Sequence, residues 1–233
     1  MREIQIGGLV PFTTIDFPGK LAAVLFLVGC PLRCAYCSNP HLLSPGDGEY
    51  DPELVLQWME KRVNRLEAVV FSGGEALMQG DATIEYMKRV RALGFKIGLH
   101  TNGFYPDTLA RAAEYIDWIG LDFKATQEKY PDLTGQNIAY NNMIRSLDIW
   151  QQTGKDFEVR ITCDPRFVSK DDLGAIADLL AGRGVKKIAV QKYTPHHEDD
   201  NNKTNAAERN QFFDDAALRE RIDGMFSSVI WRE

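Results

Sequence analysis

The chain has 233 residues, of which 44% are hydrophobic and 26% charged, a composition typical of one sizeable soluble α/β domain. The formal net charge of −6 and the lack of a Lys/Arg-dense stretch argue against nucleic acid as a partner, and no apolar run approaches the ~20 residues of a membrane span. The opening "MREIQIGG" is too polar for a signal peptide, so we expect a reducing, cytoplasmic location, where clustered thiols favour metal or redox chemistry.

The first 20 residues alternate like a short antiparallel β-hairpin, with Gly7 and Gly8 at its turn. Strand-like and helix-like runs then alternate along the chain. The six predicted strands are residues 21–28, 67–72, 96–100, 118–123, 157–163 and 186–192. The predicted helices are residues 52–63, capped by Asp51, and then 82–93, 106–115, 141–153 and 170–182.

Repeated β-then-α order predicts the α/β fold class, with a parallel sheet and helices packed outside it. Six such units fall short of the eight that close a TIM barrel, so we expect an open, partial (βα)6 barrel. The chain is predicted to be a single domain, with the hairpin at 1–20, the barrel core at about 21–193, and a C-terminal loop and helix at 194–233.

Polar residues and glycines follow the predicted strands, and in parallel folds such strand ends share one rim. The segments concerned are "GCPLRCAYCSNPH" (29–41), "SGGEA" (72–76), "HTNG" (100–103), "LDFK" (121–124) and "QKYTPHH" (191–197), with Arg160 inside the fifth strand. Their convergence predicts the functional site.

Three of the four cysteines, Cys30, Cys34 and Cys37, lie within eight residues. Three interpretations compete: a structural zinc site that adds His41, a dithiol redox pair at Cys34 and Cys37, and an iron–sulfur cluster with three protein ligands and one open iron. A structural zinc site usually pairs a CxxC element with distant ligands, and the rest of the sequence offers only Cys163 and scattered histidines. A redox pair leaves Cys30 without a role. The fourth, Cys163, ends a strand and is predicted to be a buried apolar residue.

The C-x3-C-x2-C spacing of "CPLRCAYC" and the glycine-rich "SGGEA" resemble the radical S-adenosylmethionine (SAM) superfamily. The segments "TTIDFPGK", "SNPH", "HTNG" and "GLDFK" further resemble the glycyl-radical-enzyme activating enzymes, especially those of anaerobic ribonucleoside-triphosphate reductase and of the pyruvate formate-lyase type. This resemblance implies one [4Fe–4S] cluster and SAM as cofactors, a glycyl radical enzyme as partner, and flavodoxin or ferredoxin as electron donor. The open iron would chelate SAM, which one electron cleaves to a 5′-deoxyadenosyl radical.

The resemblance also implies roles for individual residues. The cysteines Cys30, Cys34 and Cys37 would ligate iron and serve catalysis. The residues expected to contact SAM are Tyr36, Ser38, Gly73, Gly74, Glu75, Thr101, Asp122, Lys124, Arg160 and His196. Plain structural roles compete for several of them: a tight turn for the glycines, a helix cap for Glu75, an ion pair for Arg160 and a solvated loop for His196.

One position departs from the family pattern. Where the pyruvate formate-lyase type has an aspartate that helps to hold a monovalent cation, this chain has His100, and imidazole binds such hard cations poorly. We therefore expect no such cation here and expect His100 to contact Asp122 or fill the space. Two other functions stay open: a radical SAM enzyme acting on a small molecule, such as a 7-carboxy-7-deazaguanine synthase, and a zinc-bound binding module.

Overall fold

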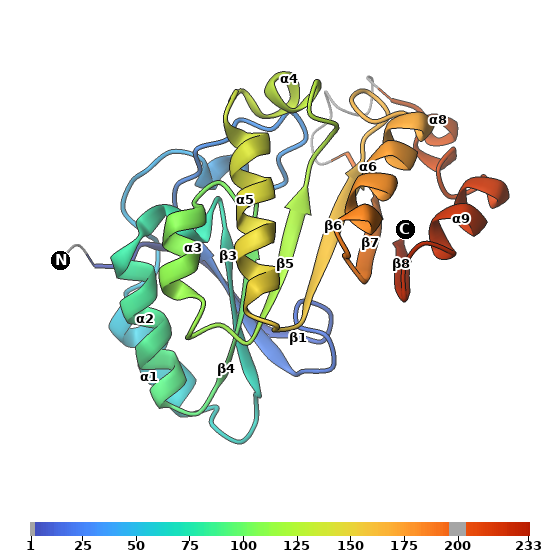
Figure 1. Ribbon diagram of the computed structural model, residues 1–233. Helices are drawn as coiled ribbons and strands as arrows, with labels where there is room; N and C mark the ends of the chain where they lie inside the picture. The colour runs from blue at the N-terminus through green and yellow to red at the C-terminus, as the bar shows by residue number, and fades with distance from the viewer. Residues whose placement is uncertain (1–2, 196–203) are drawn as a thin grey trace. The chain divides into compact units, whose positions relative to one another are not determined.

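The computed structural model describes residues 3–195 and 204–233, which form two compact units (Figure 1). The first unit comprises the described part of 1–32 with 39–120 and 141–157, and the second comprises 33–38, 121–140 and the described part of 158–233. Strand β5 (Trp118–Phe123) and helix α5 (Ala139–Gln152) each contribute residues to both units. Among the described residues, no helix is long and apolar enough to cross a bilayer.

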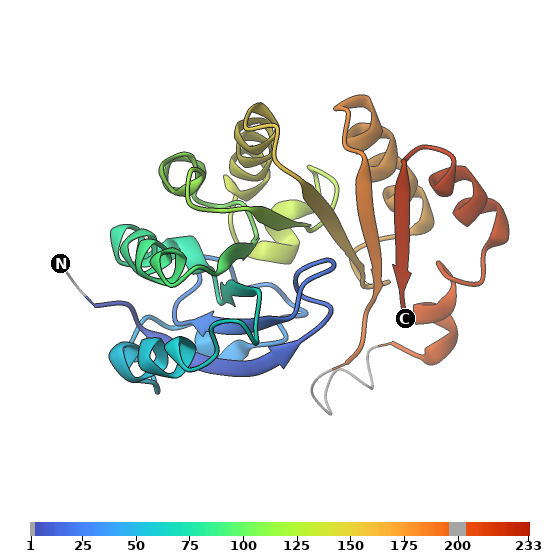
Figure 2. The same ribbon diagram turned by 90° about the horizontal axis from the view of Figure 1, so that it is seen from below.

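The first unit is built on four strands in the order β1-β2-β3-β4. Strand β1 (Ile6–Thr13) pairs antiparallel with β2 (Ala22–Leu27), whereas β3 (Ala68–Gly73) and β4 (Lys96–Thr101) continue in parallel. Its helices are α1 (Pro52–Glu60), α2 (Asp81–Ala92) and α3 (Pro106–Ala112), which lie outside the strands (Figure 2), and two 3-10 turns are η1 (Pro40–Leu42) and η2 (Ala76–Gln79).

The second unit holds the parallel strands β6 (Phe157–Cys163), β7 (Lys187–Lys192) and β8 (Ser228–Arg232). Its helices are α4 (Tyr130–Thr134), α6 (Lys170–Gly182), α8 (Ala206–Asn210) and α9 (Ala216–Asp223). All six predicted strands and all five predicted helices are present, with ends shifted by a few residues. Asp51 caps α1 as predicted, because its side chain accepts the backbone N–H groups of Glu53 and Leu54.

Two terminal features differ from the sequence-based expectation. The N-terminal antiparallel pair exists, but Gly7 and Gly8 lie inside β1 and not at its turn. A Cβ on Gly7 would lie 2.5 Å from Leu42 Cδ2, and the register shifts between Ile6 and Gly8. These glycines therefore permit close packing at a strand irregularity, a role that is equally common for glycine. The second feature is strand β8, which lies in the region predicted to be a C-terminal loop and helix.

The segment "IDFPGK" connects β1 to β2 and closes the core of the first unit. Phe17 is buried in a cluster with Val24, Val70 and Trp118, and its ring centroid lies 5.5 Å from that of Trp118. Gly98 in β4 leaves room for this ring, because a Cβ there would lie 2.9 Å from Phe17 Cδ2. This segment therefore has a structural role that needs no partner protein.

Candidate active site

The cysteine loop follows β2 directly, and none of its three cysteines, nor the buried Cys163, forms a disulfide. Cys30 is buried, and its backbone N–H donates to the carbonyl oxygen of Leu43 at 3.1 Å. Cys34 and Cys37 are partly buried and close a turn in which Cys37 N–H donates to Cys34 O at 3.1 Å. Cys30 belongs to the first unit, and Cys34 and Cys37 belong to the second. The prediction that Cys163 is buried is confirmed.

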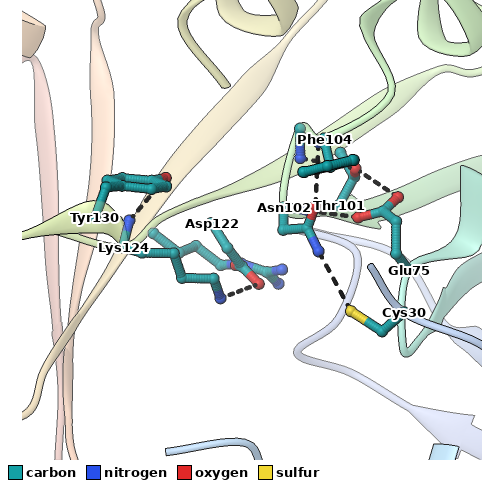
Figure 3. Close-up of polar contacts among 10 residues, drawn as sticks. Cys30, Glu75, Thr101, Asn102, Phe104, Asp122, Lys124 and Tyr130 are labelled. Carbon is teal, nitrogen blue, oxygen red and sulfur yellow. Dashed lines mark hydrogen bonds and ion pairs between the residues drawn. The ribbon is translucent and has the colours of Figure 1, made fainter. Parts of the chain in front are cut away.

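A buried carboxylate organises the site of the first unit. Glu75 Oε1 accepts hydrogen bonds from Thr101 Oγ1 at 2.8 Å and from Leu77 N at 3.1 Å, and Oε2 accepts one from Asn102 N at 2.8 Å (Figure 3). Glu75 therefore caps η2, as one interpretation of the sequence expected, and also fixes the end of β4. Asn102 Nδ2 in turn lies 3.7 Å from Cys30 Sγ.

The glycine pair allows the backbones of β3 and the cysteine loop to meet. Gly73 has φ +126°, and a Cβ on it would lie 2.2 Å from Leu27 N, while a Cβ on Gly74 would lie 2.4 Å from Gly29 O and 3.0 Å from the Cβ of Cys30. No side chain fits at either position. The glycines are thus required by close backbone approach, which a plain tight turn would not explain.

The second unit gathers three of the predicted SAM contacts. Asp122 Oδ1 accepts a hydrogen bond from Arg160 Nε at 2.7 Å. Asp122 Oδ2 accepts one from Lys124 Nζ at 3.3 Å (Figure 3). The two cation side chains are only 11–12% exposed. Burial by itself would lower the pKa of Lys124, but the Asp122 carboxylate together with Tyr36, Cys34 and Tyr130 outweighs it and raises the pKa. One carboxylate between two cations leaves this group with a net positive charge.

Aromatic and thiol groups surround Lys124. Its ammonium lies 5.6 Å from the ring centroid of Tyr36. The backbone N–H of Lys124 donates to the hydroxyl oxygen of Tyr130 at 3.2 Å. The hydroxyl of Tyr36 is buried and has no hydrogen-bond partner within the described residues. Burial raises the pKa of the Cys34 thiol, an effect that the Lys124 charge only partly offsets. Metal ligation would remove that proton.

The remaining predicted residues have different environments. Ser38 is exposed, and Thr101 is buried and donates its hydroxyl hydrogen to Glu75. His100 Nε2 lies 2.9 Å from the carbonyl oxygen of Asp16, which makes Nε2 the protonated nitrogen, since a carbonyl can only accept. His196 lies outside the described residues.

Comparison with known proteins identifies the family. The model of the radical SAM superfamily matches residues 24–180, about two thirds of the chain. The chain belongs to the radical SAM superfamily. Members of this superfamily use a [4Fe–4S] cluster and SAM, so the predicted cofactors and the assignment as an enzyme are confirmed.

Three relatives of this radical SAM protein are informative. A Methanocaldococcus jannaschii protein provisionally named as a glycyl-radical enzyme activating enzyme is 28% identical over 199 residues, 82% of this chain and 80% of its own. The pyruvate formate-lyase-activating enzyme of Clostridium pasteurianum is 26% identical, covering 83% and 81%. The 7-carboxy-7-deazaguanine synthase of M. jannaschii is 25% identical, covering 79% and 82%. The predicted resemblance to the activating-enzyme family is confirmed.

Solved structures confirm the fold class. Native anSMEcpe with bound AdoMet superimposes with a TM-score of 0.66 at 14% identity, covering 86% of this chain and 61% of that chain. This likeness, together with mostly parallel strands in both units, supports the expected partial (βα)6 barrel of the radical SAM core.

The residues present fit the cofactors of a radical SAM protein. The three thiols are soft donors that form no disulfide, so they suit iron–sulfur ligation. Among the described residues, no three His, Cys, Asp or Glu side chains are already gathered as a metal group. In the second unit, the Tyr36 hydroxyl, which has no hydrogen-bond partner among the described residues, and the largely buried cations Lys124 and Arg160 suit the polar and charged groups of a sulfonium nucleotide.

Sequence reasoning missed Asn102, which touches Cys30, and Tyr130, whose hydroxyl holds the backbone of Lys124. The short motif "HTNG" did contain a usable pattern, because an Asn before Gly favours a turn in which the amide bonds to nearby backbone. Tyr130 follows its strand by seven residues, and nothing in its spacing predicts the contact.

Proposed function

We propose that this protein is an activating enzyme that installs a glycyl radical on a partner enzyme. The observation that carries the proposal is the joint presence of three closely spaced cysteines outside any disulfide and the Glu75 network, in a chain with activating-enzyme relatives over about four fifths of its length. The sequence resemblance of "TTIDFPGK" and "GLDFK" to this class supports it further.

In this proposal Cys30, Cys34 and Cys37 ligate the cluster. When bound, the cluster supplies the electron that cleaves SAM reductively to methionine and a 5′-deoxyadenosyl radical. Gly73 and Gly74 let the backbone approach the methionine amino group.

The cationic pair of the second unit then has a defined task. Lys124 and Arg160 bind the methionine carboxylate or the ribose, because buried guanidinium and ammonium groups form strong charge-assisted hydrogen bonds. Asp122 orients both. Tyr36 and Ser38 support the adenine end, and His196 is proposed to touch the ribose. The resemblance also implies that Glu75 and Thr101 contact SAM, and in this structure both residues hold the turn beside Cys30.

The finer assignment is anaerobic ribonucleoside-triphosphate reductase as the partner, with flavodoxin or ferredoxin as electron donor and the cytoplasm as location. It is supported by the motif resemblance and by an acidic chain that lacks a spanning helix in its described part. The competing function is synthesis of 7-carboxy-7-deazaguanine, which the relative of that name favours.

Electron paramagnetic resonance separates these functions. The reduced, cluster-loaded protein is mixed without oxygen with SAM and either anaerobic ribonucleotide reductase, pyruvate formate-lyase or the small-molecule substrate of the synthase. We expect a glycyl radical on the reductase and none when the Cys30→Ala variant replaces the wild type. A radical on pyruvate formate-lyase alone would overturn the finer assignment. Turnover of the small molecule without any glycyl radical would reject the activating function.

A further inference from the structure

Asn102 points its side-chain amide nitrogen at the sulfur of Cys30. The amide oxygen accepts the backbone N–H of Phe104 at 3.0 Å, and this contact fixes the orientation of the group, because an N–H can donate only to the oxygen. The nitrogen therefore faces Cys30 Sγ, 3.7 Å away, at a distance suited to an N–H···S hydrogen bond (Figure 3). Asn102 is only 7% exposed and Cys30 only 6%.

The turn that carries Asn102 is held rigidly within the first unit. Its backbone N–H donates to Glu75, and the two residues that follow are bonded to helix α5. Ser146 Oγ donates to Gly103 O at 2.7 Å, and Asn142 Nδ2 donates to Phe104 O at 3.0 Å. A turn fixed on both sides cannot easily swing the amide away from the sulfur.

The position of Cys30 is set by the same Glu75 segment. The backbone N–H of Glu75 donates to Gly29 O at 2.8 Å, and Gly74 packs against the Cβ of Cys30. The donor and the acceptor of the N–H···S contact are thus both positioned by residues 74–75. Such preorganisation is more than a buried structural asparagine needs, since its oxygen and backbone are already satisfied.

We propose that Asn102 tunes the reduction potential of the iron–sulfur cluster by hydrogen bonding to the thiolate of Cys30. This inference rests on the proposed role of Cys30 as a cluster ligand. Reduction by one electron from the external donor adds negative charge to the cluster and its sulfurs, so a hydrogen-bond donor stabilises the reduced form more than the oxidised form. In a buried, low-dielectric environment this preference is strengthened. Asn102 is a positioning and tuning residue, since it acts through the sulfur of Cys30.

The test is the midpoint potential of the cluster, measured by electron paramagnetic resonance of redox-poised samples. Two variants remove the amide donor: Asn102→Ala deletes the whole group, and Asn102→Asp keeps the shape and the oxygen that accepts from Phe104 but adds a negative charge. We expect Asn102→Ala to make one-electron reduction about tenfold less favourable, a decrease of about 59 mV, and Asn102→Asp to lower the potential by at least as much. Asn142→Ala is the matched control, because Asn142 bonds to the same turn but the structure shows no contact between it and Cys30 in the described residues. It should keep the wild-type potential.

Thermal unfolding of the cluster-free proteins reports whether each variant folds, and cluster absorbance reports loading. A wild-type potential in both loaded Asn102 variants would overturn the inference, as would an equal shift in Asn142→Ala. In either case the wild-type protein would still carry its cluster and cleave SAM, so the proposed function would stand. If instead the wild type failed to assemble a cluster, the proposed function itself would fail.

Discussion

At the scale of single residues, the site depends on a few buried polar groups with more than one partner. Glu75 is 1% exposed and accepts hydrogen bonds from a hydroxyl and two backbone N–H groups. Removal of such a carboxylate leaves buried donors without acceptors, and each costs about 1–3 kcal/mol. The position of Glu75 in "SGGEA" was predictable from the sequence. The hydrogen bond from the backbone N–H of Asn102 to Glu75 was not predictable, because it joins residues 27 positions apart in the sequence.

We predict that Glu75→Ala lowers the free energy of unfolding of the cluster-free protein by about 3 kcal/mol. Urea denaturation followed by circular dichroism measures the change. Glu128→Ala is the matched control, since Glu128 is exposed, and should change stability by less than about 0.5 kcal/mol. Equal stability of Glu75→Ala and wild type would show that the network is not structural.

The cationic pair allows a binding prediction at the same scale. Arg160→Gln should weaken the binding of SAM to the cluster-loaded protein by about 10- to 100-fold, the effect of losing one charged hydrogen bond of about 1.5–3 kcal/mol. Equilibrium dialysis with labelled SAM measures it. Arg145→Gln removes an exposed ion pair with Asp107 and should leave the affinity unchanged. Unaltered binding in Arg160→Gln would remove this residue from the SAM site.

At the scale of secondary structure elements, the connections between helices and strands fix the geometry. The loop after β3 brings Gly74 against Gly29 and Cys30. Asp117, directly before β5, hydrogen-bonds to residues of α2 and β4. Asp117 accepts hydrogen bonds from Arg91, Lys96 and the backbone N–H of Ile97. Helix caps such as Asp51 can be predicted because they act locally, whereas these connections depend on tertiary contacts.

Two glycine substitutions should have opposite effects. Gly74→Ala forces a Cβ to within 2.4 Å of a backbone oxygen, so it should lower the melting temperature and prevent Cys30 from adopting its place. Gly182→Ala lies at the end of α6 with nothing within 4 Å, and it should stabilise the protein by about 0.5–1 kcal/mol. Differential scanning calorimetry compares them. A higher melting temperature for Gly74→Ala would contradict the close backbone approach described here.

The hydrogen bonds of Asp117 predict that the stability of the fold depends on pH. Burial tends to raise the pKa of this carboxyl, but the backbone of Ile97 and the charges of Lys96 and Arg91 outweigh it and lower the pKa. A depressed folded-state pKa contributes stability above the unfolded pKa, and that stability is lost as the pH falls through the folded value. Asp117→Asn should therefore cost about 1 kcal/mol at pH 7 and progressively less below about pH 4. Urea denaturation at both pH values measures this, and a pH-independent difference would contradict it.

At the scale of the whole molecule, hydrophobic patterning is sufficient to predict the α/β class and the central strands, because these strands carry apolar runs such as Ala22–Leu27. It failed at the ends of the chain. Strand β8 is short and half-buried, so "SVIWR" offers no long apolar run, and Gly7 and Gly8 have turn-like composition although they lie in a strand. The cysteine spacing alone leaves zinc, redox and iron–sulfur chemistry open, and the family resemblance that this spacing carries implies the cofactor class.

The most direct test of the central claim is cleavage of SAM by the anaerobically reconstituted protein. We predict about four irons per chain and formation of 5′-deoxyadenosine after reduction, both abolished in each of the Cys30→Ala, Cys34→Ala and Cys37→Ala variants and retained in Cys163→Ala, whose thiol is buried in β6. Chromatography of the nucleoside product gives the result. A wild-type protein without iron, or equal 5′-deoxyadenosine from the Cys30→Ala variant, would contradict the account.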